Sequence, residues 1–257
     1  MSQSISSDRV ALVTGGAKGI GAEVCRRLAA KGLKVWVADL DLAQAQALSA
    51  ELREQGGRAE AITLDVGDPG SVATVFAQVQ AQDGRCDVLV NSAGIAKVFP
   101  FLDFPLDNFV ATMNVNVTGT LLCAQHAARL MVRHRWGRIV NIASVAGLRA
   151  VGSGRTAYGT SKGAVVALTR QMAAELAEHG ITANAVCPGP VDTPMTRVLH
   201  TDQFREEYAK AIPMERYGTT AEIAAAVLYL ASEEATYTTG VALPVDGGFL
   251  ASGARGL

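Results

Sequence analysis

From one end to the other, the sequence alternates between short apolar runs and longer segments with a helical spacing of apolar residues. Most of the apolar runs are continuous, which is typical of parallel strands covered on both faces. We expect strands at Val10–Thr14, Lys34–Asp39, Ala59–Leu64, Asp87–Asn91, Arg138–Ala143, Ile181–Cys187 and Val241–Val245. We expect helices at Ile20–Lys31, Leu42–Gln55, Pro69–Gln82, Leu106–Arg135, Thr156–His179 and Thr220–Ser232. This alternation predicts an α/β fold with a doubly wound parallel sheet.

The sheet should have about seven strands with helices on both faces, which is a Rossmann fold. The chain has 257 residues, a length that fits one large domain, and no repeat or low-complexity linker divides it. We therefore predict a single domain over residues 9–257, preceded by a flexible tail at residues 1–8. The segment Met195–Tyr217 interrupts the alternation and is predicted to be a mobile lid over the substrate.

Composition excludes several classes of protein. Lys and Arg total 23 against 24 Asp and Glu, and aromatic residues make up 5% of the chain. A surface that binds nucleic acid needs a basic excess and often aromatic side chains for base stacking, so no nucleic-acid partner is expected. The charged content of 18% and the hydrophobic content of 49% fit a globular protein with a sizeable core.

Neither a metal site nor a membrane segment is predicted. The four cysteines form no C-x-x-C motif, and the four histidines show no paired ligand spacing. The segment Phe109–Ala128 lacks charged residues, but it contains several amide and hydroxyl side chains that would be costly in lipid. Residues Met1–Asp8 are polar and lack the apolar core of a secretory signal. We expect a cytoplasmic protein with reduced, buried thiols.

A glycine-rich turn follows the first expected strand. Gly15, Gly19 and Gly21 have the spacing G-x-x-x-G-x-G and open a predicted helix. Glycine lets the backbone bend tightly and approach a pyrophosphate, while the helix N-terminus supplies free N–H groups and a positive dipole end. We assign Gly15, Lys18, Gly19, Ile20 and Gly21 to cofactor binding.

Asp39 ends the second expected strand, eighteen residues after Gly21. A carboxylate at this place accepts hydrogen bonds from the adenosine ribose hydroxyls and repels a 2′-phosphate. Leu40 and Asp41 follow it, so no base stands next to it to bind that phosphate. Lys18 in the glycine turn points the other way, but two acids outweigh one base. The sequence therefore predicts NAD rather than NADP as the cofactor.

Small or polar residues also end the third and fourth strands. Asp65 and Val66 follow the third, and Asn91-Ser92-Ala93-Gly94 closes the fourth. Taken alone, each segment is what an ordinary turn requires. Because the carboxyl ends of parallel strands share one edge of the sheet, we expect both segments to face the adenine and ribose. We assign Asp65, Val66, Asn91, Ala93 and Gly94 to cofactor binding.

A candidate catalytic set lies in the second half of the chain. Tyr158 and Lys162 are four residues apart on one face of a predicted helix, and Ser144 follows the fifth strand. Together with the glycine turn, Asp39 and the segment Asn116-x-x-Gly119, this order of motifs resembles the short-chain dehydrogenase/reductase family. The resemblance covers about Arg9 to Phe249. Two positions depart from the common family pattern, Ser92 in place of Asn and Ala143 in place of Ser.

The resemblance implies a role for each of these residues. Tyr158 would be the general acid/base, Lys162 would bind the nicotinamide ribose and lower the pKa of Tyr158, Ser144 would hold the substrate oxygen, and Asn116 would anchor a water that relays protons. A tyrosine has an ordinary pKa of about 10, so a nearby ammonium is needed for it to act as a base at neutral pH. The nicotinamide end would be bound by Tyr158, Lys162, Pro188, Gly189, Val191 and Thr193.

These observations predict an oxidoreductase that transfers a hydride between NAD(H) and a small secondary alcohol or ketone. A metal ion is not needed for this chemistry. Two alternatives are kept: an NADP-dependent reductase of 3-oxoacyl thioesters, and a non-catalytic NAD(H)-binding sensor or scaffold. Asp39 argues against the first, and the complete set of catalytic residues argues against the second.

Proteins of one fold vary their pockets, so the substrate is inferred from the residues expected around the reacting groups. Arg149 and Arg155 lie between Ser144 and Tyr158, and Arg197 lies at the start of the predicted lid. Together with Ser144 and Tyr158 they are the candidate substrate residues. A guanidinium pairs well with a carboxylate or phosphate, so a substrate with an anionic end is one expectation, and a neutral polyol is the other.

The chain is also expected to form a homotetramer. The predicted helix Thr156–His179 carries apolar residues around more than one face, among them Val165, Val166, Leu168 and Met172. A helix of this kind needs cover from a partner as well as from the sheet. The family resemblance implies the same assembly.

Overall fold

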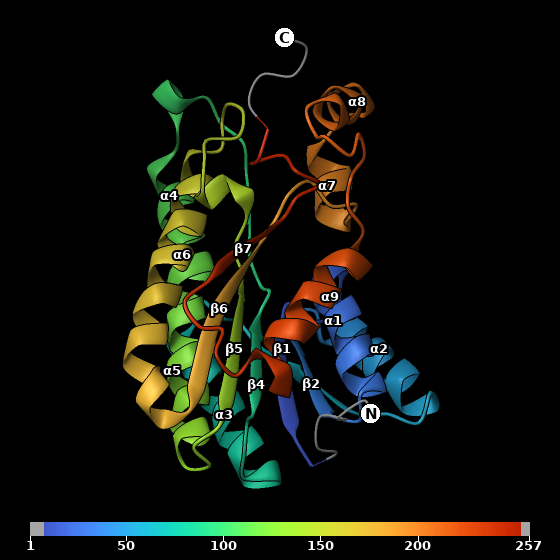
Figure 1. Ribbon diagram of the computed structural model, residues 1–257, viewed down its shortest axis with the longest axis vertical. Coiled ribbons are helices and arrows are strands. Elements are labelled where there is room, and N and C mark those ends of the chain that lie inside the picture. The colour runs from blue at the N-terminus through green and yellow to red at the C-terminus, as the bar shows by residue number, and fades with distance from the viewer. Residues whose placement is uncertain (1–7, 253–257) are drawn as a thin grey trace.

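The computed structural model describes residues 8–252, so most of the predicted tail at residues 1–8 lies outside the described residues. A single seven-stranded sheet forms the centre of the molecule, with the strand order β3-β2-β1-β4-β5-β6-β7 and parallel pairing throughout (Figure 1). The strands are β1 Val10–Thr14, β2 Lys34–Asp39, β3 Arg58–Thr63, β4 Val88–Asn91, β5 Gly137–Ile142, β6 Ile181–Pro188 and β7 Ala242–Val245. The doubly wound Rossmann fold predicted from the sequence is confirmed.

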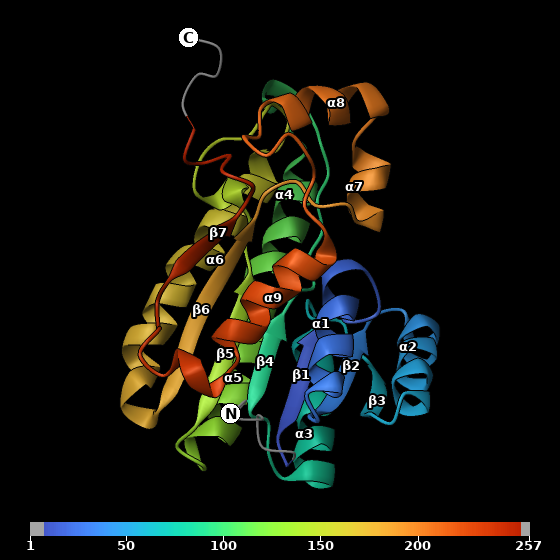
Figure 2. The same ribbon diagram turned by 45° about the vertical axis from the view of Figure 1, so that its right-hand side comes forward.

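Helices cover both faces of the sheet (Figures 1 and 2). One face carries α1 Gly19–Ala30, α2 Leu42–Glu54 and α9 Thr220–Leu230. The other carries α3 Pro69–Asp83, α4 Leu106–Met113, α5 Gly119–Val132 and α6 Thr156–Leu176. In Figure 1, α1, α2 and α9 stand to the right of the strands, and α4, α5 and α6 stand to the left. Two shorter helices, α7 Pro194–Leu199 and α8 Asp202–Lys210, lie at the upper end of the molecule.

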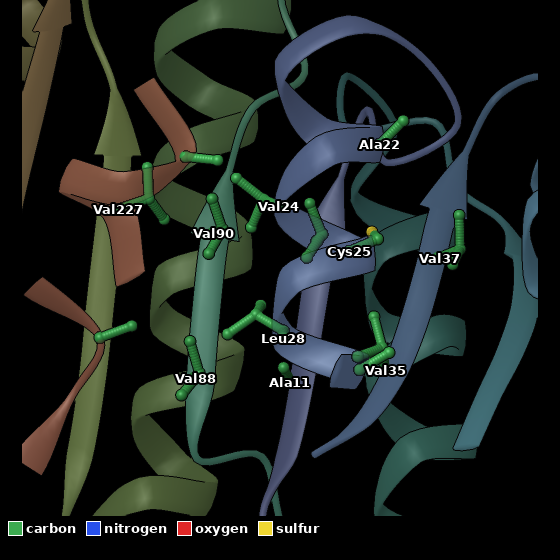
Figure 3. Close-up of a cluster of buried hydrophobic side chains, with 14 of the residues drawn as sticks. Ala11, Ala22, Val24, Cys25, Leu28, Val35, Val37, Val88, Val90 and Val227 are labelled. Carbon is green, nitrogen blue, oxygen red and sulfur yellow. The ribbon is translucent and has the colours of Figure 1, made fainter. Parts of the chain in front are cut away.

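The core has two layers because successive strand residues point to opposite faces. In β1, Ala11 and Val13 join the cluster with α1 and α9, whereas Val10 and Leu12 join the cluster with α3 and α5. Figure 3 shows the first of these clusters, where Leu28 of α1 lies among valines from the neighbouring strands. Every residue of β1 is buried, which explains why this strand is a continuous apolar run.

One predicted helix is in fact interrupted. The segment Leu106–Arg135 forms α4, then one turn of π-helix at Asn114–Thr118, and then α5. The wider turn is accompanied by a buried Asn116 whose side-chain amide bonds groups outside the helix, at Ile95 and Ser161. Apolar periodicity continues through the interruption, so it gave no sign of this local change. Single π-turns of this kind are frequent at functional sites.

The predicted lid segment is formed by α8 and all but the first residue of α7, followed by a loop that leads to α9. Thr193 and Thr196 form a capping box at the start of α7, and Thr201 caps α8. Hydroxyl side chains at these positions accept from the first free N–H groups of each helix. The segment Met195–Tyr217 is called the lid segment below, and its movement stays a prediction.

The strand order reverses between β1 and β4, and this arrangement opens a crevice at their carboxyl ends. Thr14 at the end of β1 connects the carboxyl ends of β1 and β4. Its hydroxyl oxygen accepts from the backbone N–H groups of Ser92 and Ala93, each at 3.2 Å. The fold therefore brings the glycine turn after β1 beside the Asn91–Gly94 segment after β4.

Candidate active site

A cleft with a volume of about 430 Å³ lies at the carboxyl ends of the strands. Residues after β1, β2, β3, β4, β5 and β6 all contribute to its wall. Most residues predicted from the sequence to bind the cofactor or substrate line it: Gly15, Lys18, Gly19, Ile20, Asp39, Asp65, Val66, Ala93, Gly94, Ser144, Tyr158, Lys162, Pro188, Gly189, Val191 and Thr193.

The glycine turn forms one end of the cleft. Gly15 has a φ of +61°, and a Cβ built on it would lie 2.8 Å from the backbone nitrogen of Ala93. Only glycine fits this conformation and this close approach. The helix α1 that follows has no side-chain cap at its N-terminus, whereas Asp41 caps α2 and Asp68 caps α3. Its first N–H groups therefore remain available to an anion in the cleft.

Asp39 borders the same end of the cleft and is fixed by the backbone. Its Oδ2 accepts from the N–H of Ala17 at 3.0 Å, and its Oδ1 accepts from the N–H of Asp41 at 3.1 Å. Each carboxylate oxygen has a further lone pair, so the group is held in place and still has acceptor capacity. Lys18 is paired with Asp41, with 3.3 Å between Nζ and Oδ2. Its positive charge is thus compensated by an acid of this chain.

Tyr158, Lys162 and Ser144 meet at the other end of the cleft. Lys162 is buried, and its Nζ donates to the carbonyl of Ile142 at 2.8 Å. The same Nζ lies 5.7 Å from the centre of the Tyr158 ring. Ser144 follows β5 and is held by a hydrogen bond at 3.1 Å, in which its Oγ accepts from the N–H of Ala146. One turn of α6 and the end of β5 thus place three polar groups together.

Burial changes the acidity of these groups. It lowers the pKa of Lys162 to about 8, because the charged ammonium is removed from water. It raises the pKa of the Tyr158 phenol, while a hydrogen bond with Ser144 and the positive charge of Arg155 act in the opposite direction. Perturbed groups that meet in a cleft are typical of a catalytic site.

Asn116 lies behind the wall of the cleft rather than on it. Its Oδ1 accepts from the N–H of Ile95 at 2.9 Å, and its Nδ2 donates to the carbonyl of Ile95 and to Ser161 Oγ. A Cβ on Gly94 would stand 3.2 Å from Asn116 Oδ1 and 3.6 Å from Lys162 Nζ. Asn116 therefore fixes the loop after β4 against α6, next to Lys162.

Two predicted cofactor residues also lie away from the cleft wall. Asn91 is buried, and its Nδ2 donates to Asn141 Oδ1 at 2.9 Å, across the sheet from β4 to β5. Gly21 packs so closely beneath the turn that a Cβ would collide with the carbonyl oxygen of Gly15. Both residues lie outside the cleft wall and help to hold the wall residues in place.

None of the three predicted substrate arginines lines the cleft in the part of the chain that the structure describes. Arg149 is exposed, with its guanidinium 5.0 Å from the centre of the Phe249 ring. Arg197 pairs with Asp192 at 2.9 Å on the surface. Arg155 lies 2.8 Å from a ring nitrogen of His200, and of the three it alone acts on the pKa of Tyr158.

Sequence reasoning did not identify several residues of the site. The additional wall residues are Leu40, Leu64, Ser92, Ile95, Val115, Ile142, Ala143, Pro194, Met195 and Thr196. Six of them lie at or just after strand ends, beside residues that were assigned, so their position was the available signal. Val115 lies in the π-turn, and Pro194, Met195 and Thr196 lie in α7. His200 falls within the predicted lid segment, and the structure buries it in a cluster of aromatic rings. No local pattern marks that burial.

Within residues 8–252, no group of three or more His, Cys, Asp or Glu side chains has the arrangement of a metal site. A search of the same residues finds no helix that is both long and apolar enough to span a membrane.

Comparisons with known proteins agree with this geometry. A family model described as enoyl-(acyl carrier protein) reductase matches residues 15–250. The chain is 36% identical to a 3-oxoacyl-[acyl-carrier-protein] reductase of Aquifex aeolicus, and the match covers 93% of this chain and 96% of that protein.

Two solved structures are similar over nearly their whole length. A short-chain type dehydrogenase/reductase from Mycobacterium marinum has a TM-score of 0.91 and 37% identity, covering 95% of this chain and 96% of the other. A gluconate 5-dehydrogenase from Burkholderia cenocepacia, in complex with NADP and tartrate, has a TM-score of 0.91 and 34% identity with the same coverage. The chain therefore belongs to the short-chain dehydrogenase/reductase family of oxidoreductases, which bind a nicotinamide cofactor.

Proposed function

We propose that the protein is an NAD-dependent dehydrogenase that interconverts a small secondary alcohol and its ketone. The observation that carries the proposal is the continuity of the cleft: one cavity is bordered by Asp39 and the glycine turn at one end and by Ser144, Tyr158 and Lys162 at the other. A cofactor bound along this cleft would supply hydride transfer at its nicotinamide ring. The chain's own residues would orient the alcohol and move its proton.

Tyr158 is the proposed proton acceptor in alcohol oxidation. Its phenolate oxygen takes the hydroxyl proton while the carbinol carbon loses a hydride, and the reverse transfer gives the alcohol from the ketone. Ser144 holds the reacting oxygen, because its hydroxyl can donate to that oxygen while continuing to accept from Ala146. The positive charges of Lys162 and Arg155 favour the phenolate over the neutral phenol.

Lys162 and Asn116 support that proton transfer. The buried ammonium of Lys162 is fixed by the carbonyl of Ile142 and has donors left for a cofactor ribose hydroxyl. Asn116 uses its side chain on Ile95 and Ser161, and its backbone carbonyl accepts from Thr120 Oγ1 at 2.8 Å. We propose that the π-turn keeps this carbonyl near Lys162, where a water relays protons to solvent.

The preference for NAD rests on charge. Asp39 has acceptor capacity for the two ribose hydroxyls of the adenosine, and a 2′-phosphate would meet both Asp39 and Asp41. Lys18 is the base that would favour NADP, and its pairing with Asp41 reduces that effect. The uncapped α1 N-terminus would bind the pyrophosphate of either cofactor.

A second candidate function is an NADP-dependent reductase of 3-oxoacyl thioesters. The specific observations that favour it are the 36% identical 3-oxoacyl-[acyl-carrier-protein] reductase, the NADP in the complex of the gluconate 5-dehydrogenase, and Lys18 in the glycine turn. The same catalytic residues would serve this reaction, so only the cofactor and the substrate distinguish the two functions.

Kinetics of the purified protein decide between them. Reduced cofactor is followed with polyols, hydroxy acids and hydroxyacyl thioesters, each with NAD and with NADP. The proposal expects turnover of a polyol or hydroxy acid with a higher kcat/KM for NAD. Oxidation of hydroxyacyl thioesters alone, with NADP, would replace it by the second candidate.

The proposal keeps an anionic end of the substrate as one possibility, with Arg155 as the residue that would bind it. If Arg155 binds such an end, Arg155→Met raises KM by at least about tenfold, the loss expected for one charged hydrogen bond. Arg197→Met is the matched comparison, because its guanidinium already pairs with Asp192 on the surface. Unchanged KM in Arg149→Met, Arg155→Met and Arg197→Met would instead favour a neutral polyol.

A further inference from the structure

His200 is a buried residue in an otherwise exposed part of the lid segment. It follows α7 directly, and 7% of its surface is exposed. Its ring centre lies 4.7 Å from that of Phe204, 6.0 Å from that of Tyr217 and 6.2 Å from that of Tyr208. These rings come from α8 and from the end of the lid segment, so His200 lies at the centre of its packing.

Both ring nitrogens of His200 have partners, and the partners determine its tautomer. Nε2 lies 2.8 Å from Nη2 of Arg155, and Nδ1 lies 2.9 Å from the hydroxyl of Tyr217. A guanidinium can only donate, so Nε2 must be the unprotonated acceptor. A neutral imidazole then carries its proton on Nδ1, which donates to the Tyr217 hydroxyl. Burial and the charges of Arg155 and Arg205 also lower the pKa of His200, to about 4.

Arg155 connects this histidine to the reacting end of the cleft. It is the residue before α6 and stands three positions before Tyr158. Residues three apart at the start of a helix are neighbours on its surface, so the side chain of Arg155 lies close to that of Tyr158. The positive charge of Arg155 lowers the pKa of the Tyr158 phenol, against the larger effect of burial, which raises it. Without His200, Arg155 would lose the acceptor that orients its guanidinium.

We propose that His200 is a positioning residue, whose neutral ring holds the guanidinium of Arg155 beside Tyr158 and so couples the lid segment to proton transfer. The proposal rests on the proposed role of Tyr158 as general acid/base. His200 does not line the cleft, and it acts on the reaction only through Arg155. Displacement of the lid segment would withdraw His200 from Arg155, so the phenolate would be stabilised most when the segment is in the described position.

Other charged and titratable groups pack around His200 and Arg155. Arg205 faces Tyr217, with its guanidinium 4.3 Å from the ring centre, and also pairs with Asp192 at 3.2 Å. Tyr208 is packed against His200 on one side and against Phe249 on the other. Burial raises the pKa of Tyr208 and of Tyr217, so both phenols are neutral across the range in which a dehydrogenase is assayed.

The test is the pH dependence of kcat/KM for the alcohol at saturating cofactor, which reports the ionisation of the proton acceptor. Arg155→Met removes the cation and should raise the apparent pKa by about 0.5 to 1.5 units, as expected for a charge several ångströms away in a partly buried site. His200→Phe keeps a ring among the aromatic side chains but lacks the acceptor, and should raise the same pKa. His200→Gln restores an acceptor and should return the pKa towards the original value.

A double variant tests whether His200 acts through Arg155. In the Arg155→Met background, His200→Phe should produce no further shift, because the guanidinium that it orients is gone. Arg216→Met is the control: it removes an arginine of the same segment that pairs with Glu222 on the surface, and the profile should stay unchanged. Melting temperatures of all variants identify any that are simply unfolded.

Two results would overturn the inference. One is an unshifted apparent pKa in a folded Arg155→Met variant, and the other is an equal shift by His200→Phe with and without Arg155. If Tyr158→Phe loses turnover but the apparent pKa of Arg155→Met is unshifted, only the role of His200 is rejected, and the proposed function stands. NMR of ¹⁵N-labelled histidine provides a second readout: the proposal requires the Nδ1–H tautomer, and an Nε2–H tautomer would contradict it.

Discussion

Cofactor choice is determined at the scale of single side chains. Asp39 and Asp41 are two positions apart in the chain, with Leu40 between them, but they have different contacts: Asp39 is anchored by two backbone N–H groups, and Asp41 pairs with Lys18. On the sequence alone, these two acids were weighed against one base, Lys18. The structure shows that Lys18, the base, is already occupied by the second acid.

Removal of one acid should therefore change the preference for NAD over NADP less than removal of both. Asp39→Ala narrows the preference for NAD, while Asp39→Ala with Asp41→Asn should narrow it further, because Lys18 then becomes free to bind a 2′-phosphate. The measurement is the ratio of kcat/KM for NAD and NADP, accompanied by fluorescence titration of NADPH binding. Addition of Lys18→Met to the double variant is the control and should abolish the gain for NADP. Equal kcat/KM values for the two cofactors in the unmutated enzyme would refute this account.

Residues with a local signature were predictable, and residues defined by distant contacts were not. Ser144, Tyr158 and Lys162 stand at strand ends or at helical spacing, so the sequence predicted that they would share the cleft, and they do. His200 has no such signature, because its partners Arg155 and Tyr217 are 45 and 17 residues away. The positions of Arg149 and Arg155 likewise depend on distant residues, Phe249 and His200, whereas Arg197 pairs with the nearby Asp192.

At the scale of elements, helix α9 has a complete capping box at its N-terminus. Thr219 and Glu222 form a capping box, and Glu222 also pairs with Arg216. The helix packs against α1 and covers part of the sheet beside the cleft. Its first turn follows the isolated bridge between Val191 and Gly218, which connects it to the wall of the site.

Loss of this cap should destabilise the protein. Thr219→Ala should lower the free energy of unfolding by about 0.5–2 kcal/mol, the usual cost of losing an N-cap side chain. Denaturant unfolding at neutral pH measures it. Thr236→Ala serves as a comparison, because Thr236 caps no helix start. An unchanged unfolding midpoint would show that the box contributes nothing measurable.

The same box predicts a pH dependence. The ion pair with Arg216, followed by the hydrogen bonds from Thr219, lowers the pKa of Glu222 to about 2 in the folded protein. A carboxyl whose folded pKa is depressed stabilises the protein above its unfolded pKa of about 4.3, and this stabilisation is lost as the pH falls towards the folded value. Glu222→Gln should therefore lower the melting temperature at pH near 7, and the difference from the unmutated protein should shrink below about pH 4. A difference independent of pH would contradict this explanation.

Element boundaries followed from periodicity wherever the backbone was regular. β1 and β2 begin and end as predicted. β4, β6 and β7 differ from the prediction by one residue at one end, and β3 and β5 by one residue at both ends. The helix predicted at Leu106–Arg135 failed at Asn114–Thr118, because a π-turn changes the hydrogen bonding without changing which residues are apolar. The cause lies in the contacts of Asn116 with Ile95 and Ser161, which sequence periodicity does not contain.

At the scale of the whole molecule, the alternation of buried strands and helices was enough to predict the fold class. The apolar residues of α6 have a different explanation from the one that the sequence suggested. Val165, Val166 and Met172, which suggested a need for a partner subunit, are buried within the same chain. Exposed apolar side chains occur instead at Phe101 and Leu102 and along α4.

The homotetramer stays a prediction and now rests on that exposed surface. Leu102 is 93% exposed, Leu106 75% and Val110 57%. Large apolar side chains exposed to this extent along one helix are expected to be covered by another copy of the chain. Light scattering at assay concentration should give a mass four times that of the chain, and Leu106→Glu with Val110→Lys should lower it. A monomeric mass for the unmutated protein would contradict the prediction.

The central claim is that Tyr158 transfers the proton when a bound secondary alcohol loses its hydride. Tyr158→Phe keeps the ring and its packing and removes only the hydroxyl. Its turnover with NAD and the best alcohol of the panel is compared with that of the unmutated protein, with binding of NADH followed by fluorescence. We expect a loss of at least about 10²- to 10⁴-fold in kcat, the usual contribution of general acid/base catalysis, with NADH binding nearly intact. Undiminished turnover in the Tyr158→Phe variant would contradict the claim.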